Sequence, residues 1–224
     1  MTTKDTQKLI LDTAIELFNQ HGSGKISANR VADTCQLSRG HLHYHFKKKE
    51  EIIGAIYERI AAEVRHGGVD DLKKPTVHHM LEMLDRYLGL IWRYRFFFRE
   101  MMALLAADEH LKQRFSRDRR DRTQVMIKYF QALIDNNVLL GPKDPRTLEN
   151  LVKASWIVSD NWINYLSVDS PAVYPDCAKE GYELMLDLFR AYLSPATLAV
   201  LREGTAGQTG DEVKEGEPPR WAMR

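Results

Sequence analysis

The stretch VADTCQLSRGHLHYHFKKKE, residues 31–50, determines how we expect the chain to fold. Serine often precedes a helix, because its hydroxyl accepts a hydrogen bond from a free backbone N–H in the first turn. Ser38 within the stretch and Ser27 just before it are placed to cap short helices over 28–34 and from 39 to about Phe46. Only Cys35, Gln36 and Leu37 lie between the first of these helices and the Ser38 cap of the second, which is the arrangement of a helix-turn-helix motif.

Three alternating histidines in this stretch raise the alternative of a metal site. On a helix, His41 and His45 share a face, while His43 points about 200° away from them. A zinc site needs three or four ligands, and no nearby cysteine or acidic residue would complete one. A strand would place all three on one face, but the surrounding apolar residues recur near helical spacing. We therefore predict no metal site.

Positive charge gathers in the same region. Residues 25–49 hold six Lys or Arg and one acidic residue, a net charge of +5, while the whole chain carries only +1. A local basic patch on a nearly neutral chain is typical of a protein that binds a polyanion such as DNA. The alternative is a solvated basic face without a partner.

The rest of the chain also shows helical periodicity, and no segment shows the simple alternation of a strand. We therefore predict an all-α fold. Its further helices are expected over 7–20, 49–67, 76–93, 96–107, 109–138, 145–166 and 173–193, with a short turn from Pro195 to Leu201. From Glu203 onward, Gly and Pro are frequent and aliphatic residues rare, which predicts a disordered tail.

The chain also lacks the sequence marks of export or membrane insertion. The N-terminal apolar stretch contains charged residues, and no uncharged apolar run approaches the ~20 residues that span a bilayer. Cys35 and Cys177 lie far apart and match no metal or redox spacing. We expect a cytoplasmic protein that does not bind membranes.

Three segments carry a resemblance to a known family. They are ILDTAIELF (10–18) with the following His-Gly-Ser, VADTCQLS (31–38), and RGHLHYHFKKKEEI (39–52). In order and spacing, over about 50 contiguous residues, they resemble the TetR family of bacterial transcriptional regulators. They look like the family's first helix, its second helix and turn, and its recognition helix with the start of the fourth helix.

Three positions depart from the family's pattern. Gln36 stands where the family usually has Gly in the turn, which costs roughly 1–2 kcal/mol if the backbone there is left-handed. His43 stands where Tyr is more common, and Lys48 where a small capping residue is common.

The resemblance implies that the recognition helix contacts DNA. The implied contacts are Ser38, Arg39, His41, His43 and Tyr44, with Lys49 on a phosphate at the start of the next helix. Arg39 is the strongest candidate for reading a base, because a guanidinium can pair with guanine through two hydrogen bonds. His43 and Tyr44 are the other candidates.

Other residues in the basic region suit contacts with the DNA backbone. Gly40 allows the main chain to approach closely, and Lys47 and Lys48, together with Lys49, would supply salt-dependent affinity without sequence information. Lys25 and Ser27 could hold a phosphate at the start of the second helix.

The later part of the chain contains no recognisable catalytic motif, and we predict neither enzymatic activity nor a cofactor. It is rich in aromatic and Met residues, which form either a packed core or the wall of an apolar pocket. The resemblance implies an effector pocket here, for which the candidate residues are Trp92, Phe96, Met101, Met102, Trp156 and Tyr165. The charged run RFSRDRRDRTQ (114–124) suits a solvated helix face, although its arginines could also bind an acidic effector.

Together these observations predict a DNA-binding domain over 1–50, an effector-binding and dimerisation domain over 51–202 and a tail over 203–224. The resemblance implies that the helices at 145–166 and 173–193 form the interface of a homodimer. The predicted function is that of a repressor released from a palindromic operator by a small apolar or amphipathic molecule. A regulator without small-molecule input and an enzyme with an aromatic pocket remain alternatives.

Overall fold

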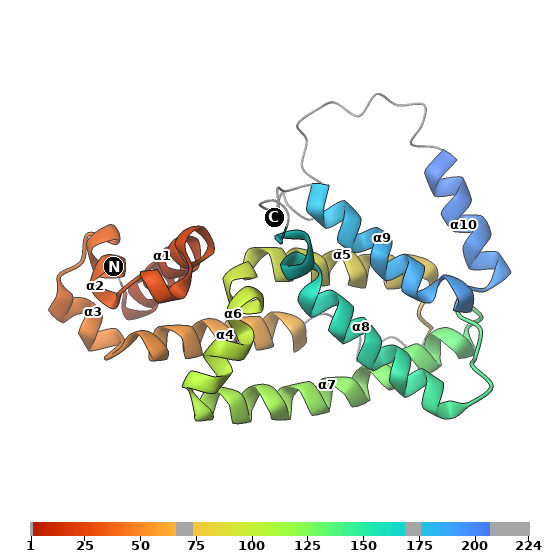
Figure 1. Cartoon of the computed structure of the whole chain (residues 1–224), viewed down its shortest axis with the longest axis horizontal. Coiled ribbons are helices and arrows are strands. Elements are labelled where there is room, and N and C mark those ends of the chain that lie inside the picture. Colours follow the sequence, from red (N-terminus) through yellow and green to blue (C-terminus); the bar gives the residue numbers. More distant parts are fainter. Residues whose placement is uncertain (1, 66–73, 169–175, 207–224) are drawn as a thin grey trace. The chain divides into compact units, whose positions relative to one another are not determined.

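A computed structural model of the chain describes residues 2–65, 74–168 and 176–206, and every regular element in them is a helix (Figure 1). The predicted all-α fold is confirmed. The elements are α1 Thr3–His21, η1 Ser23–Lys25, α2 Ala28–Thr34, α3 Arg39–His45, α4 Lys49–Arg65, α5 Val77–Arg93, α6 Arg95–Ala107, α7 Glu109–Asp135, α8 Pro145–Leu166, α9 Asp176–Phe189, η2 Arg190–Tyr192 and α10 Pro195–Ala206. None of these helices has the length and apolar character needed to cross a membrane.

The observed boundaries differ from the predicted ones mainly at the ends of the chain. α1 begins at Thr3 because Thr2 and Asp5 exchange hydrogen bonds between their side chains and backbone N–H groups, which forms a capping box. α10 continues to Ala206, so the chain is still helical at Glu203, where the tail was predicted to begin. The remainder of that predicted tail, 207–224, lies outside the described residues.

The chain forms two compact units, which are not contiguous in sequence. Unit 1 comprises Met1–His66 and Arg93–Asp118, and unit 2 comprises Gly67–Trp92 and Arg119–Arg224. Two of the divisions fall inside helices, between Trp92 and Arg93 at the end of α5 and between Asp118 and Arg119 within α7. The division predicted from the sequence, at 50 and 202, stays a prediction.

In unit 1, α1 packs against α2, α4 and α6, and α2 packs against α3. The core of this unit includes Ile10 and Phe18 of α1, Val31 of α2 and Leu42 of α3, all nearly inaccessible to solvent. The predicted caps are confirmed, since Ser27 accepts a hydrogen bond from Arg30 N–H and Ser38 accepts one from His41 N–H.

In unit 2, α8 and α9 lie side by side (Figure 1). Gly181 of α9 allows this close packing, because a Cβ atom at that position would lie 2.8 Å from the indole of Trp162 on α8. Phe130 of α7 stacks on Phe189 of α9, with 5.0 Å between their ring centroids. The segment after α7 is fixed by Val138, whose carbonyl accepts hydrogen bonds from Ser194 N–H and the Thr197 hydroxyl.

The turn between α2 and α3 contains a strained residue. Gln36 has a φ of 57°, in the left-handed region, which is one of the two outcomes that its position in the family's glycine turn left open, the other being a slightly different turn. The next residue closes the turn, with Leu37 N–H donating to the Ala32 carbonyl at 2.9 Å. The backbone therefore keeps the glycine conformation even though the side chain is present.

We predict that Gln36→Gly raises the free energy of unfolding by up to about 1 kcal/mol, because relief of the left-handed strain exceeds the extra chain entropy of glycine. Gln36→Ala is the matched control, since it shortens the side chain but keeps a Cβ atom in the strained conformation. Urea unfolding of the three proteins measures the effect. Equal stability of the Gly and Ala variants would contradict the prediction.

Candidate functional sites

The exposed side of α3 carries four of the residues predicted to contact DNA. Arg39, His41, His43 and Tyr44 are all exposed, and Tyr44 reaches 78% exposure. Leu42, between them in sequence, is 3% exposed and packs into unit 1. α3 therefore has one anchored face and one free face that can enter a DNA groove.

The residues predicted to contact the DNA backbone lie before, within and after α3 in the sequence, and most of them are exposed to solvent. Exposed members of the set are Lys25, Ser27, Ser38, Gly40, Lys47 and Lys48. Lys49 is half-buried instead, and its ammonium donates a hydrogen bond to the Ser23 carbonyl at 2.7 Å. A lysine has three N–H donors, so this bond leaves two of them for a phosphate. Contact with DNA stays a prediction for all of these residues.

The loop between α1 and α2 is tied to α6 by side chains that the sequence analysis did not single out. The carboxylate of Glu100 accepts hydrogen bonds from both the backbone N–H and the hydroxyl of Ser23. One turn earlier on α1, Asn19 donates to the Arg93 carbonyl at 2.9 Å and accepts from Phe96 N–H at 3.0 Å. These bonds position the helix-turn-helix motif on α6. No sequence motif marks them, because they join residues more than 70 positions apart.

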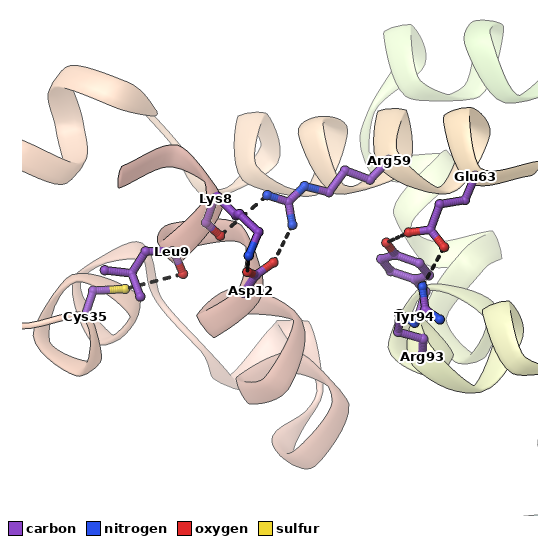
Figure 2. A network of polar contacts seen from close by, with 8 residues as sticks. All are labelled: Lys8, Leu9, Asp12, Cys35, Arg59, Glu63, Arg93 and Tyr94. Carbon is purple, nitrogen blue, oxygen red and sulfur yellow. Dashed lines mark hydrogen bonds and ion pairs between the residues drawn. The ribbon is translucent and has the colours of Figure 1, made fainter. Parts of the chain in front are cut away.

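α4 adds a second set of ties within unit 1 (Figure 2). The Arg59 guanidinium pairs with Asp12 of α1, which also pairs with Lys8. One turn further along α4, Glu63 accepts hydrogen bonds from Arg93 and from the Tyr94 hydroxyl. Burial, and then this bond and the charge of Glu63, raise the pKa of Tyr94, so its hydroxyl stays a donor.

The histidines of α3 are arranged as the helix predicts. The rings of His41 and His45 lie together, with centroids 5.4 Å apart, and His43 is exposed. Within the described part of the chain, no group of three or more His, Cys, Asp or Glu residues is placed to hold a metal ion.

The candidate effector residues divide between the two units. Phe96, Met101 and Met102 belong to unit 1, whereas Trp92, Trp156 and Tyr165 belong to unit 2. Phe96 is part of the core of unit 1, where its ring meets that of Phe18 edge to face at 5.0 Å. Met102 and Tyr165 lie at the surface, with exposures of 75% and 74%.

Trp156 belongs to a polar and aromatic cluster of unit 2, formed by Tyr87 of α5, Arg122 of α7, and Trp156 and Asp160 of α8. The rings of Tyr87 and Trp156 are nearly perpendicular, with centroids 5.5 Å apart. The Arg122 guanidinium lies over both rings, 4.3 Å from the centroid of Trp156 and 5.4 Å from that of Tyr87. The Tyr87 hydroxyl donates to Asp160 at 3.0 Å.

Burial dominates the titration of Asp160. It raises the pKa of this carboxyl to about 6, against the opposing effects of the Tyr87 hydrogen bond and of the Arg122 and Arg119 charges. Removal from water also raises the pKa of Tyr87 well above its ordinary value, so Tyr87 remains a donor. The cluster thus holds an incompletely neutralised acid beside an arginine.

One feature of this cluster is visible in the sequence. Trp156 and Asp160 are spaced by four residues, so they share a face of α8. Arg122, by contrast, lies in the charged run predicted to be a solvated face, and the structure shows it half-buried. Which arginine of that run turns inward depends on the helices packed against it.

Comparison with known proteins identifies the family. A family model described as a bacterial transcriptional repressor of the TetR type matches residues 65–201, and one described as bacterial regulatory proteins of the tetR family matches residues 10–56. The chain belongs to the TetR family. It is therefore a transcriptional regulator of a DNA-binding, repressor-type family.

Individual relatives are similar over different shares of the chain. The chain is 33% identical over 83 residues to the probable acrEF/envCD operon repressor of Escherichia coli K12, covering 32% of this chain and 38% of that protein. It is 34% identical over 55 residues to the transcriptional regulator AcrR of Shigella flexneri, covering 25% and 26%. These matches span well under two thirds of either relative.

The likeness in structure extends over nearly the whole chain. A TetR-family transcriptional regulator from Marinobacter aquaeolei VT8 superposes with a TM-score of 0.79 at 27% identity, over 91% of this chain and 98% of that one. A transcriptional regulator from Aquifex aeolicus VF5 has a TM-score of 0.59 at 21% identity, over 82% and 99%, and so supports the fold alone.

We predict that Asp160→Asn changes how stability depends on pH. The folded-state pKa of about 6 exceeds the ordinary value of 3.8, so protonated Asp160 stabilises the fold below about pH 4 and this stabilisation is lost as the pH rises through 6. The variant lacks this loss but can still accept the Tyr87 hydrogen bond. The free energy of unfolding of the variant, relative to that of the wild type, should therefore increase as the pH rises from 4.5 to 7.5.

Denaturant unfolding across that pH range measures the difference. Asp187→Asn is the matched control, because it makes the same change at an exposed carboxylate of α9. If Asp160→Asn and Asp187→Asn follow the wild-type pH profile equally, Asp160 is not desolvated as described.

Proposed function

We propose that the protein is a homodimeric repressor that binds a palindromic operator through α3 and leaves it when a small molecule binds unit 2. The single observation that carries the proposal is the free face of α3. There Arg39, His41, His43 and Tyr44 stand exposed on a capped helix whose opposite side is anchored by Leu42. A helix so presented can enter the major groove and reach base edges.

Charge supports the same reading of this face. The six basic residues within 25–49 include the exposed Lys25, Arg30, Arg39, Lys47 and Lys48. Contacts from such residues to phosphates supply affinity that depends on salt but not on sequence. Arg39 is proposed as the residue that adds sequence preference. A regulator with this role acts where the DNA lies, in the cytoplasm.

An apolar stripe on α8 supports dimerisation. Ile157, Tyr165 and Val168 recur at helical spacing along one side of α8 and its end, with exposures of 66%, 74% and 79%. Leu184 of the neighbouring α9 is 40% exposed. A second copy of the chain would cover these side chains, and a twofold axis would pair two α3 helices with two operator half-sites about one helical turn apart.

Release by a small molecule is proposed as a shift between two populations. A ligand that binds more tightly to a state whose α3 spacing does not match the operator favours that state and lowers DNA affinity. The half-buried polar cluster of unit 2 supports a ligand site there. Operator binding that no small molecule changes would leave a regulator without small-molecule input.

We predict that substitutions in the basic region separate base reading from phosphate binding. Arg39→Lys keeps the charge but loses the paired donors, so it should weaken operator binding by roughly 1–3 kcal/mol while affinity for random DNA stays unchanged. Lys48→Ala should weaken both equally and lower the salt slope by about one phosphate contact per protomer. DNA from upstream of the protein's own gene and random DNA, compared across a salt series, provide the measurement.

Lys128→Ala is the control for a change of charge at an exposed lysine of α7, outside the basic region. It should bind both DNAs as the wild type does. If the wild type binds both DNAs equally, or if Arg39→Lys loses affinity for random DNA as well, Arg39 does not read sequence.

We also predict that Ile157→Asp converts the dimer to a monomer and lowers operator affinity at nanomolar protein concentration. Ile157 is 66% exposed within one chain, so the substitution leaves the core of the protomer intact and acts on association. Sedimentation velocity measures the oligomeric state. Met102→Asp, at an exposed apolar residue of α6, is the matched control and should remain dimeric. A dimer that persists in Ile157→Asp would place the interface elsewhere.

A further inference from the structure

We propose that the effector is an apolar organic cation, which displaces the Arg122 guanidinium from the faces of Tyr87 and Trp156 and binds beside the Asp160 carboxylate. This inference rests on the function proposed above, because it names the chemistry of the molecule that unit 2 would sense.

The geometry of the two rings defines a cation site. Tyr87 and Trp156 meet at an interplanar angle of 83°, so their faces form two walls of a corner. The guanidinium carbon of Arg122 lies over both faces, at 5.4 and 4.3 Å from the centroids. Both distances fall within the range of attractive cation–π contacts, which are strongest at Trp. The protein's own cation thus shows what charge and shape this corner accepts.

Asp160 favours a cation over an anion at this place. Its carboxylate accepts a hydrogen bond from the hydroxyl of Tyr87, one of the two rings, at 3.0 Å. Removal from water outweighs the help it receives from Arg122 and Arg119, so its negative charge is incompletely compensated. A ligand cation that binds closer to the Asp160 carboxylate than Arg122 does would compensate this negative charge more fully. An anion attracted to Arg122 would instead be repelled by Asp160.

A polar atom of one of the two rings specifies the ligand further. The indole N–H of Trp156 is buried and has no hydrogen-bond partner among the described residues. A buried donor without a partner is unfavourable, and a ligand oxygen could accept from it. The buried N–H of Trp162 also has no partner among the described residues, but Trp162 is not part of this cluster, since its ring packs against Gly181 of α9. The proposed ligand therefore combines a cationic head, an apolar body and an acceptor atom.

Because the ligand is proposed to compete with Arg122, the proposal predicts in which direction ligand affinity changes when Arg122 is removed. If the ligand takes the place of the guanidinium, then removing the guanidinium should strengthen ligand binding. If Arg122 were instead the residue that binds an acidic effector, its removal would weaken binding. A purely structural cluster would give no difference between ligands of opposite charge.

The test uses the full-length dimer and three probes of nearly equal size and shape: 2-naphthamidine, which is cationic, 2-naphthamide, which is neutral, and 2-naphthoate, which is anionic. Isothermal titration calorimetry should show binding in the order amidine, amide, naphthoate. Asp160→Asn should weaken amidine binding about tenfold or more, as expected for loss of a desolvated charge pair, and leave amide binding unchanged. Arg122→Gln should strengthen amidine binding several-fold.

Asp187→Asn, at an exposed carboxylate of α9, is the matched control and should bind the amidine as the wild type does. If Arg122→Gln does not fold, the order of the three probes and the effect of Asp160→Asn still decide the question. Equal binding of amidine and amide, tighter binding of naphthoate, or an unchanged Asp160→Asn variant would each overturn the proposal.

Operator binding without any probe separates this inference from the proposed function. Specific binding by the free protein, with no preference for the amidine, would overturn the cation site and leave the regulator in place. Amidine binding with the expected variant pattern, but without specific DNA binding, would support the cation site and overturn the repressor.

Discussion

The hydrogen bonds that Ser23 makes with Glu100 and Lys49 are the constraint on which the placement of the DNA-binding motif depends. Ser23 is nearly inaccessible to solvent, and three of its groups are used: the N–H and the hydroxyl by Glu100, and the carbonyl by Lys49. Hydrogen bonds with a charged partner are stronger than neutral ones, and these two partners come from α6 and α4. The loop that leads into α2 is therefore fixed from two sides.

This constraint matters because α2 and α3 are too short to hold themselves in place. Each has seven residues, and helices of that length are not stable alone in water. Val31 and Leu42 are buried, α3 packs against α2, and α2 packs against α1. α1 is in turn tied to α6 by Asn19 and to α4 by Asp12. The free face of α3 is thus positioned by contacts on the opposite side of the motif, which leaves its own side chains available for DNA.

The parts of this arrangement that follow local rules could be predicted from the sequence. Ser27 and Ser38 marked the starts of α2 and α3, and the position of Gln36 in the family's glycine turn pointed to a left-handed backbone as one of two alternatives. The long-range polar contacts could not be predicted in this way. Glu100 pairs with Ser23, 77 positions away, and Asp160 pairs with Tyr87, 73 positions away. Neither pairing produces a periodic pattern in the sequence.

The same limit explains why the aromatic residues were hard to assign. Phe96 and Trp156 are both large apolar residues at helical spacing, and only their neighbours distinguish them. Phe96 meets Phe18 inside the core of unit 1, while Trp156 meets an arginine and lies one turn from a carboxylate. Periodicity reports that a residue is buried, but it does not report whether the buried surroundings are apolar or charged.

The cluster around Asp160 is also a place where the structure departs from what stability alone would favour. An apolar residue of similar size at this position would avoid the cost of removing a carboxylate from water. Natural chains tend to keep such locally unfavourable groups where function requires them. α7 adds a reason to expect function here, since Arg122 follows by one turn Asp118, which accepts a hydrogen bond from Tyr57 of α4. α7 therefore carries the arginine of the cluster in the part that belongs to unit 2, and the contact to Tyr57 in the part that belongs to unit 1.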